Sequence, residues 1–258
     1  MEELSDLVEE ALAHPISGWD FSWLDGRLTW AKLPWDYDAM VSRLALSSPD
    51  LLDLGTGGGE WLAALPGRPV RTVALEGFDP NLPIARARLE PLGIEVLGYT
   101  SPHDNVAQTE DEPPLPFPAG SFHLVVDRHE SFVATEIHRV LRPGGRFLTQ
   151  QVSTFNSIRT LLRAPATASA APAWGLSMAV GQVGGAGLMV EEALEARTTV
   201  HVLDVGALVW YLLAVPWEVP DFTVERYWSR LVSLHQRCRQ GPLTFEMESF
   251  LVAARRPE

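Results

Sequence analysis

Short apolar runs alternate with longer amphipathic segments through the middle of the chain, from about residue 48 to residue 152. Because buried parallel strands are apolar almost throughout, the runs predict strands over residues 51–54, 71–75, 94–97, 122–126 and 146–152. The segments between them predict helices over residues 60–65, 83–92 and 135–141. Strands that alternate with helices at this spacing predict an α/β domain with right-handed crossovers and a parallel sheet.

Further helical patterns flank this region on both sides. Residues 1–13 carry apolar positions at helical spacing, and residues 1–47 together predict a helical, Trp-rich N-terminal segment. The C-terminal part predicts a strand, two helices and a strand, within residues 188–202, 205–215, 223–239 and 243–254. We therefore place the main domain at residues 48–258, with a helical insertion at about 204–240.

A glycine-rich turn follows the first predicted strand. The segment Asp53–Gly59 has the sequence DLGTGGG and leads directly into a predicted helix. Glycine permits positive φ and close approach of a ligand to the backbone. The next strand ends at a second acid, Glu76, whose carboxylate can accept hydrogen bonds from both hydroxyls of a ribose. Turn and acid together predict a nucleoside site at the carboxyl ends of the strands.

A dinucleotide site is the obvious alternative, since it also combines a glycine turn with a ribose-binding acid. Here the glycines follow the pattern Gly-x-Gly-Gly-Gly from Gly55 onward, and the next residue is Glu60. A carboxylate at the start of the helix would repel a pyrophosphate that has to approach this point. The spacing therefore disfavours a nicotinamide-dinucleotide oxidoreductase.

Four motifs in order resemble class I S-adenosylmethionine (SAM)-dependent methyltransferases. They are LLDLGTGGGEWL at 51–62, Glu76, PLPFPAGSFHLVV at 114–126 and EIHRVLRPGGRFL at 136–148. The resemblance is greatest to the group that includes ubiquinone- and menaquinone-pathway enzymes. It implies a Rossmann-like three-layer sandwich with a mostly parallel seven-stranded sheet, an antiparallel final strand, N-terminal helices and a C-terminal helical cap. It also implies SAM as cofactor and S-adenosylhomocysteine (SAH) as product.

The resemblance also implies which residues hold the cofactor. The methionine part would lie on Asp53 and on the turn, at Gly55, Thr56, Gly57 and Gly59. Glu76 would bind the ribose, and Gly77 or Phe78 would flank the adenine. The acid that meets the adenine amino group in the family matches Asp104, with Asn105 as the alternative.

Candidate catalytic groups follow the fourth strand, in the segment Asp127–Glu130. His129 is the candidate general base, because imidazole titrates near neutral pH, and Glu130 or Asp127 could orient it. Arg128 is a candidate contact of the cofactor. The competing interpretation is that these residues only cap the sheet. Methyl transfer from a sulfonium needs a base only when the acceptor carries a proton that must leave.

Other residues are candidates for covering the cofactor or meeting the acceptor. Trp35 and Tyr37 precede the glycine turn and could form a lid, although packing explains them equally well. Gln151, at the end of the fifth strand, could bind the acceptor. Trp210, in the helical insertion, could line an apolar roof, which favours a small organic acceptor. The alternatives are an RNA or protein methyltransferase on the same fold, and a SAM- or nucleoside-binding protein without methyl transfer.

Composition narrows the possible partners. The formal net charge is −13 and no basic run exceeds two residues, which argues against a nucleic-acid partner. The single cysteine, Cys238, excludes an intramolecular disulfide, and the histidines lack metal-ligand spacing, so we predict no metal. No apolar stretch approaches the ~20 residues of a membrane span, and the acidic N-terminal segment does not resemble a targeting peptide. We expect a cytoplasmic protein that is a monomer or a homodimer.

Overall fold

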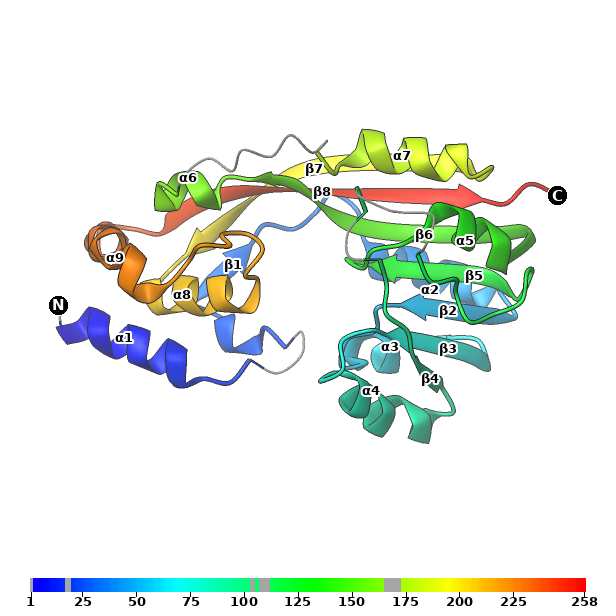
Figure 1. Ribbon diagram of the computed structural model, residues 1–258, viewed down its shortest axis with the longest axis horizontal. Helices are drawn as coiled ribbons and strands as arrows, with labels where there is room; N and C mark the ends of the chain where they lie inside the picture. Colours follow the sequence, from blue (N-terminus) through cyan, green and yellow to red (C-terminus); the bar gives the residue numbers. More distant parts are fainter. Residues whose placement is uncertain (1, 17–19, 103–104, 107–111, 165–172) are drawn as a thin grey trace. The chain divides into compact units, whose positions relative to one another are not determined.

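The computed structural model describes residues 2–16, 20–102, 105–106, 112–164 and 173–258 (Figure 1). These fall into two compact units. Unit 1 takes in the described residues of 1–33, 155–170 and 197–248, and unit 2 those of 34–154, 171–196 and 249–258. Three of the boundaries between the units fall within long strands, namely β6 (Leu141–Asn156), β7 (Met189–Val202) and β8 (Leu243–Arg255).

Within the described residues, eight strands form one sheet, in the order β1-β7-β8-β6-β5-β2-β3-β4. The shorter strands are β1 (Leu28–Trp30), β2 (Asp50–Leu54), β3 (Arg71–Glu76), β4 (Glu95–Gly98) and β5 (Phe122–Arg128). Parallel pairing joins β4, β3, β2, β5 and β6, which confirms the predicted parallel sheet. The predicted number of seven was one too low, because β1, which pairs antiparallel with β7, has only three residues and no strand-like pattern.

The final strand is antiparallel, as predicted. The N–H of Gly144 donates to the carbonyl oxygen of Arg256, whereas the N–H of Ser157 donates to that of Glu246. Residue numbers therefore fall along β8 as they rise along β6, which is the signature of antiparallel neighbours.

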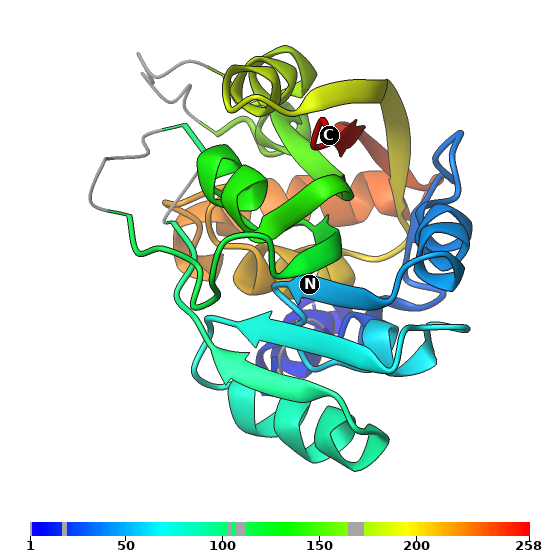
Figure 2. The ribbon, with the colours of Figure 1, turned by 90° about the vertical axis from the view of Figure 1, so that its right-hand side faces the viewer.

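Both faces of the parallel sheet in unit 2 are covered by helices. Neighbouring residues of a strand point to opposite faces. One face packs Leu51 and Ala74 with α2 (Tyr37–Leu46), α3 (Glu60–Ala64) and α4 (Leu82–Leu89), which a 3-10 turn (Glu90–Leu92) follows. The other packs Leu52 and Val73 with α5 (Ala134–Val140) and α7 (Leu176–Gly185). In Figure 2, α2 and α5 lie on opposite sides of the strands. Burial on both faces explains why the central residues of these strands are mostly apolar.

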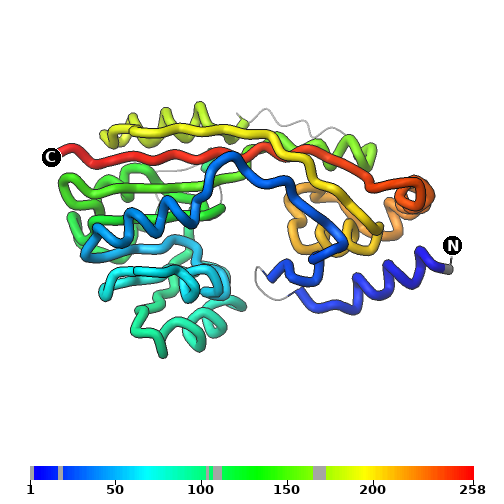
Figure 3. Tube along the Cα trace, turned by 180° about the vertical axis from the view of Figure 1, so that it is seen from behind, coloured from blue at the N-terminus to red at the C-terminus, as the bar shows by residue number. Residues whose placement is uncertain are grey.

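Unit 1 has a core of its own. Its helices are α1 (Glu2–Ala13), a 3-10 turn (Ser22–Leu24), α6 (Ile158–Leu162), α8 (Val205–Ala214) and α9 (Val224–Cys238). The helices predicted at 205–215 and 223–239 are α8 and α9. Apolar faces of α1, α8 and α9 pack together with Val200 and Phe245, and α1 can be followed in dark blue in Figure 3. Arg27 donates to both carboxylate oxygens of Asp204, which also caps α8.

No helix in the described part of the chain is long and apolar enough to cross a membrane.

Candidate functional site

The glycine turn sits at the carboxyl end of β2 and is fastened to β3. Thr56 donates its N–H to the carbonyl oxygen of Leu75 at 2.9 Å. Gly55 has φ of 66°, in the left-handed region that favours glycine. A Cβ at this position would lie 2.5 Å from Oε2 of Glu130 and 2.6 Å from its Cβ. Glycine at position 55 thus allows the Glu130 side chain to lie directly on the turn.

Glu76 joins the end of β3 to this turn. Its Oε2 accepts the N–H of Gly57 at 2.6 Å, and its Oε1 accepts the N–H of Phe78 at 2.7 Å. The residue is only 4% exposed. Burial raises the pKa of this carboxyl, and the N–H groups of Phe78 and Gly57 work in the opposite direction. The structure therefore brings together the turn and the acid that the sequence had singled out separately.

Beyond Glu76 the chain passes through a confined glycine to an exposed ring. A Cβ on Gly77 would lie 2.5 Å from the carbonyl oxygen of Tyr99, so the backbone here has no room for a side chain. Phe78 follows with 57% of its surface exposed. An exposed aromatic next to a carboxylate offers a planar group both a stacking surface and a hydrogen-bond acceptor.

Asp53 is a buried acid with an unused oxygen. It is 3% exposed, and its Oδ2 is buried without a hydrogen-bond partner among the described residues. Burial raises the pKa of Asp53 to about 7; the nearby Thr56 side chain and the charge of Arg128 lower this pKa, and the charge of Glu76 raises it. A buried polar atom without a partner is costly unless a ligand or water satisfies it. The orphaned oxygen therefore suits a ligand that brings a donor or a positive charge.

Asp127 organises the loop after β5. It is fully buried; its Oδ1 accepts the N–H of Glu130 at 3.0 Å, and its Oδ2 accepts from Thr149 Oγ1 at 3.2 Å and Gln151 Nε2 at 3.1 Å. The hydroxyl of Tyr37 donates to the Asp127 carbonyl oxygen at 2.9 Å. Burial raises the pKa of Asp127 well above its usual value. From the sequence, Asp127 was a candidate only as a partner of His129, and this central position was missed, although an acid at the end of an apolar strand is the same signal as Asp53.

Comparison with known proteins identifies this arrangement. A family model described as a methyltransferase domain matches residues 52–149. The matched segment contains the glycine turn, Glu76, Asp127 and the Pro-Gly-Gly turn. Residues 52–149 thus carry a methyltransferase domain. No curated protein matches the chain. The narrower likeness to ubiquinone- and menaquinone-pathway enzymes remains a prediction.

Solved structures share the fold of this methyltransferase domain at low sequence identity. A candidate methyltransferase from Bacillus halodurans C-125 has 21% identity and a TM-score of 0.58, covering 86% of this chain and 99% of its own. The YcgJ protein from Bacillus subtilis has 16% identity and a TM-score of 0.55, with 86% and 98% covered. The 4+2 cyclase SpnF has 15% identity and a TM-score of 0.50, with 99% and 94% covered.

His129 projects from the loop of the methyltransferase domain that Asp127 organises. Its φ is 70°, its N–H donates to the carbonyl oxygen of Gln150 at 2.9 Å, and its side chain is exposed. The surrounding protein and the charge of Arg128 lower the pKa of His129. Glu130 Oε1 accepts the N–H of Ser131 at 3.1 Å, and no hydrogen bond joins Glu130 to the imidazole in the described part of the chain. The predicted pairing of His129 with Glu130 is therefore not formed.

The remaining polar candidates are engaged in the same network. Gln151 is 3% exposed, and besides Asp127 its Nε2 donates to the carbonyl oxygen of Glu130 at 2.9 Å and to Thr149 Oγ1 at 2.9 Å. Its amide nitrogen thus supports the loop instead of reaching toward an acceptor. Trp35 is half-buried and donates from Nε1 to Gln150 Oε1 at 2.8 Å. Tyr37 is buried beneath the loop, which places it as a support and not as a cover.

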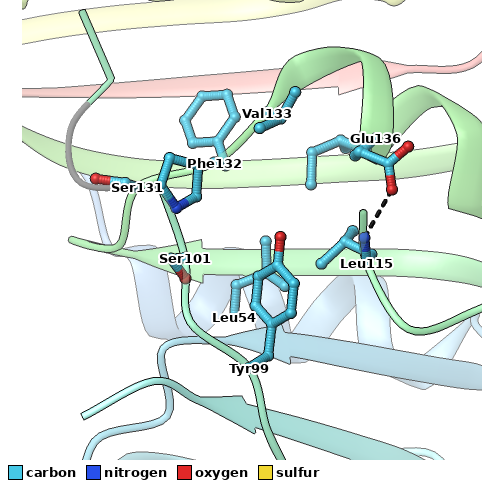
Figure 4. Close-up of a pocket in the computed structure, with 10 residues that line it drawn as sticks. Leu54, Tyr99, Ser101, Leu115, Ser131, Phe132, Val133 and Glu136 are labelled. Carbon is cyan, nitrogen blue, oxygen red and sulfur yellow. Dashed lines mark hydrogen bonds between the residues drawn. The ribbon is translucent and has the colours of Figure 1, made fainter. Parts of the chain in front are cut away.

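A narrow pocket opens beside the carboxyl ends of β2, β4 and β5 (Figure 4). Its walls are mainly apolar, and its polar edges are tied down: Tyr99 donates its hydroxyl to the carbonyl oxygen of Pro113 at 2.7 Å, and Glu136 Oε2 accepts the N–H of Leu115 at 2.7 Å. The lining consists of Leu54, Tyr99, Ser101, Pro102, Leu115, Ser131, Phe132, Val133, Glu136 and Ile137. Sequence reasoning did not single out these residues, because they come from four separate segments.

Two further candidates lie elsewhere. Asp104 lies outside the described residues. Its alternative, Asn105, is buried, and its Oδ1 accepts the N–H of Phe132 at 3.0 Å, which leaves that oxygen engaged within the protein. Trp210 belongs to unit 1, where it is 1% exposed, packs against Phe21 and Trp23, and donates from Nε1 to the carbonyl oxygen of His14. Trp210 is a core residue of that unit, so the predicted roof does not include its ring.

Proposed function

We propose that the chain binds SAM at the glycine turn and transfers the methyl group to a small organic acceptor. One observation carries the proposal: Glu76 is hydrogen-bonded to the turn through Gly57, so the groups suited to a methionine part and to a ribose form one continuous surface. The sulfonium supplies an already activated methyl group. The protein then has mainly to align the acceptor and exclude water.

The residues at the turn fit this ligand. Glu76 Oε2 accepts the N–H of Gly57 and Oε1 that of Phe78, and a carboxylate oxygen can accept a further hydrogen bond from a ribose hydroxyl. Asp53 Oδ2 lacks a partner and would accept from the ammonium of the methionine part. Arg128, whose Nη1 lies 3.6 Å from Asp38 Oδ1, would supply a positive charge for the carboxylate, and Phe78 an exposed ring for the adenine. Gly55, Thr56, Gly57 and Gly59 would hold the methionine part through their backbone, as the family resemblance implies.

His129 is the proposed base for an acceptor that has to lose a proton. Support comes from its exposed side chain and its place after β5, where the carboxyl ends of the strands border the ligand crevice. A base with a lowered pKa is a modest acceptor of protons. We expect His129→Gln to reduce transfer to a hydroxyl acceptor while leaving SAM affinity unchanged, and loss of both would contradict this role.

Binding calorimetry tests the cofactor. The wild-type protein should bind SAM and SAH but not NAD, and Glu76→Ala should weaken SAM binding at least about tenfold, because hydrogen bonds to charged groups contribute about 1.5–3 kcal/mol. Glu192→Gln, which neutralises an exposed carboxylate on β7, is the matched control and should bind as wild type does. Absence of SAM binding, or an unaffected Glu76→Ala variant, would refute the proposal.

Transfer of labelled methyl groups tests the acceptor class. A small acceptor is supported by the net charge of −13, which disfavours nucleic acid. Methyl-labelled SAM should label low-mass compounds of a cell extract in the presence of the protein and of Glu192→Gln, but not of Glu76→Ala. Label found only in RNA or protein would overturn the small-acceptor assignment without touching the cofactor.

A second candidate is a SAM-binding protein that catalyses another reaction. It is favoured by the structural likeness to a 4+2 cyclase, since a shared fold does not require a shared reaction. SAM binding with no labelled product in any fraction would favour this candidate.

A further inference from the structure

The Glu130 side chain lies along the glycine turn. A Cβ built on Gly55 would fall within 2.8 Å of three Glu130 atoms, Oε2, Cβ and Cγ. The backbone of Glu130 is held from both sides: its N–H donates to Asp127 Oδ1 and its carbonyl oxygen accepts from Gln151 Nε2. Asp127 and Gln151 are themselves buried. The position of the Glu130 backbone is therefore fixed by the interior of the protein.

The turn is surrounded by an excess of buried negative charge. Asp53 and Glu76 are nearly inaccessible, and the charge of Glu76 acts on both Asp53 and Glu130. Burial raises the pKa of each of these three carboxyls, and Arg128 offsets part of the charge at Asp53. Desolvated like charges are unfavourable unless a positive charge joins them. The surface that would receive the methionine part therefore favours a cation.

Resting on the proposed function, we propose that Glu130 is the counter-charge for the sulfonium of SAM and makes the site prefer SAM over SAH. During transfer a lone pair of the acceptor forms the new bond to the methyl carbon, and the carbon–sulfur bond breaks with its electron pair remaining on sulfur. The sulfur is then neutral, and its attraction to Glu130 disappears. Glu130 thus holds the donor and favours release of the product.

Calorimetry with three ligands separates charge from shape. SAM has a sulfonium, sinefungin replaces it with an amine that is protonated at neutral pH, and SAH has a neutral sulfur. Glu130→Gln keeps the size of the side chain and removes its charge. We expect it to weaken SAM and sinefungin about tenfold, as for loss of one charge-assisted contact, and to change SAH less than about twofold.

Two variants complete the design. Glu130→Asp retains the charge and should keep most of the preference for SAM over SAH. Glu192→Gln removes one exposed carboxylate of unit 2 and should leave all three affinities unchanged, since exposed charges are screened. Unaltered SAH binding by Glu130→Gln also shows that its site remains folded.

Equal weakening of all three ligands by Glu130→Gln would overturn the counter-charge role and indicate a structural one. Unchanged SAM affinity in that variant would overturn it as well. Failure of the wild-type protein to bind SAM would instead refute the proposed function on which the inference rests.

Discussion

Lowering the pH from 8 to 6 should weaken SAM binding about tenfold through Asp53. Burial raises the pKa of this carboxyl to about 7, and its Oδ2 has no partner among the described residues. The charged form, which suits a cationic ligand, dominates above that pKa. Its fraction is about 0.9 at pH 8 and about 0.1 at pH 6, and apparent affinity scales with the competent fraction.

The assay is calorimetric titration with SAM at half-unit steps between pH 6 and pH 8. Asp53→Asn is the matched variant, because it keeps the shape of the side chain and removes the titration. It should bind weakly, and its profile should show only the ionisation of the ligand. Repeating the titration in buffers of different ionisation enthalpy should reveal proton release on binding near pH 6.5, since a bound cation lowers the pKa of a nearby carboxyl.

Two results would refute the reasoning. One is a wild-type affinity that does not change between pH 6 and pH 8. The other is an Asp53→Asn variant with the affinity and pH profile of the wild type. The first would mean that the Asp53 carboxyl does not titrate in this range or does not affect the ligand, and the second that another group is responsible.

Three further predictions concern stability. A raised carboxyl pKa makes the folded state hold its proton longer than the unfolded chain, so the Asp53 contribution to stability falls as pH rises from about 4 to about 7. Asp53→Asn should therefore raise Tm more at pH 8 than at pH 5 in thermal melts, and equal shifts would contradict this. In Gly77→Ala the new Cβ would lie 2.5 Å from the Tyr99 carbonyl oxygen. The variant should therefore lower the free energy of unfolding, measured in urea, by about 1–3 kcal/mol and should weaken SAM binding. An unchanged urea midpoint would be inconsistent with this geometry. Asp204→Ala removes both the cap of α8 and the ion pair with Arg27 and should cost about 1–3 kcal/mol in the same assay, whereas Asp204→Asn should lose less because it can still cap the helix.

Much of unit 2 was predictable from the chain alone. Parallel strands buried on both faces need uninterrupted apolar runs, and β2, β3 and β5 carry them. The positive φ of Gly55 and the close approach of Glu130 both require a residue without a side chain. The turn therefore has to contain glycine, and this made it recognisable in the sequence. Glu76 was recognisable because the end of a strand next to such a turn is a position set by topology. These signals are local, so a single sequence reveals them.

The tertiary structure decided which partner each polar group has. Glu130, expected beside His129, lies on Gly55, and Asp127 emerges as the support of the loop. Trp210, expected over a ligand, is buried in the core of unit 1, while the three-residue strand β1 exists only through its pairing with β7. Side-chain direction, long-range pairing and burial depend on segments far apart in the chain, and the periodicity of one segment carries no information about them. The order of elements and the place of the cofactor site thus follow from the sequence, whereas the charges that face the ligand follow from the fold.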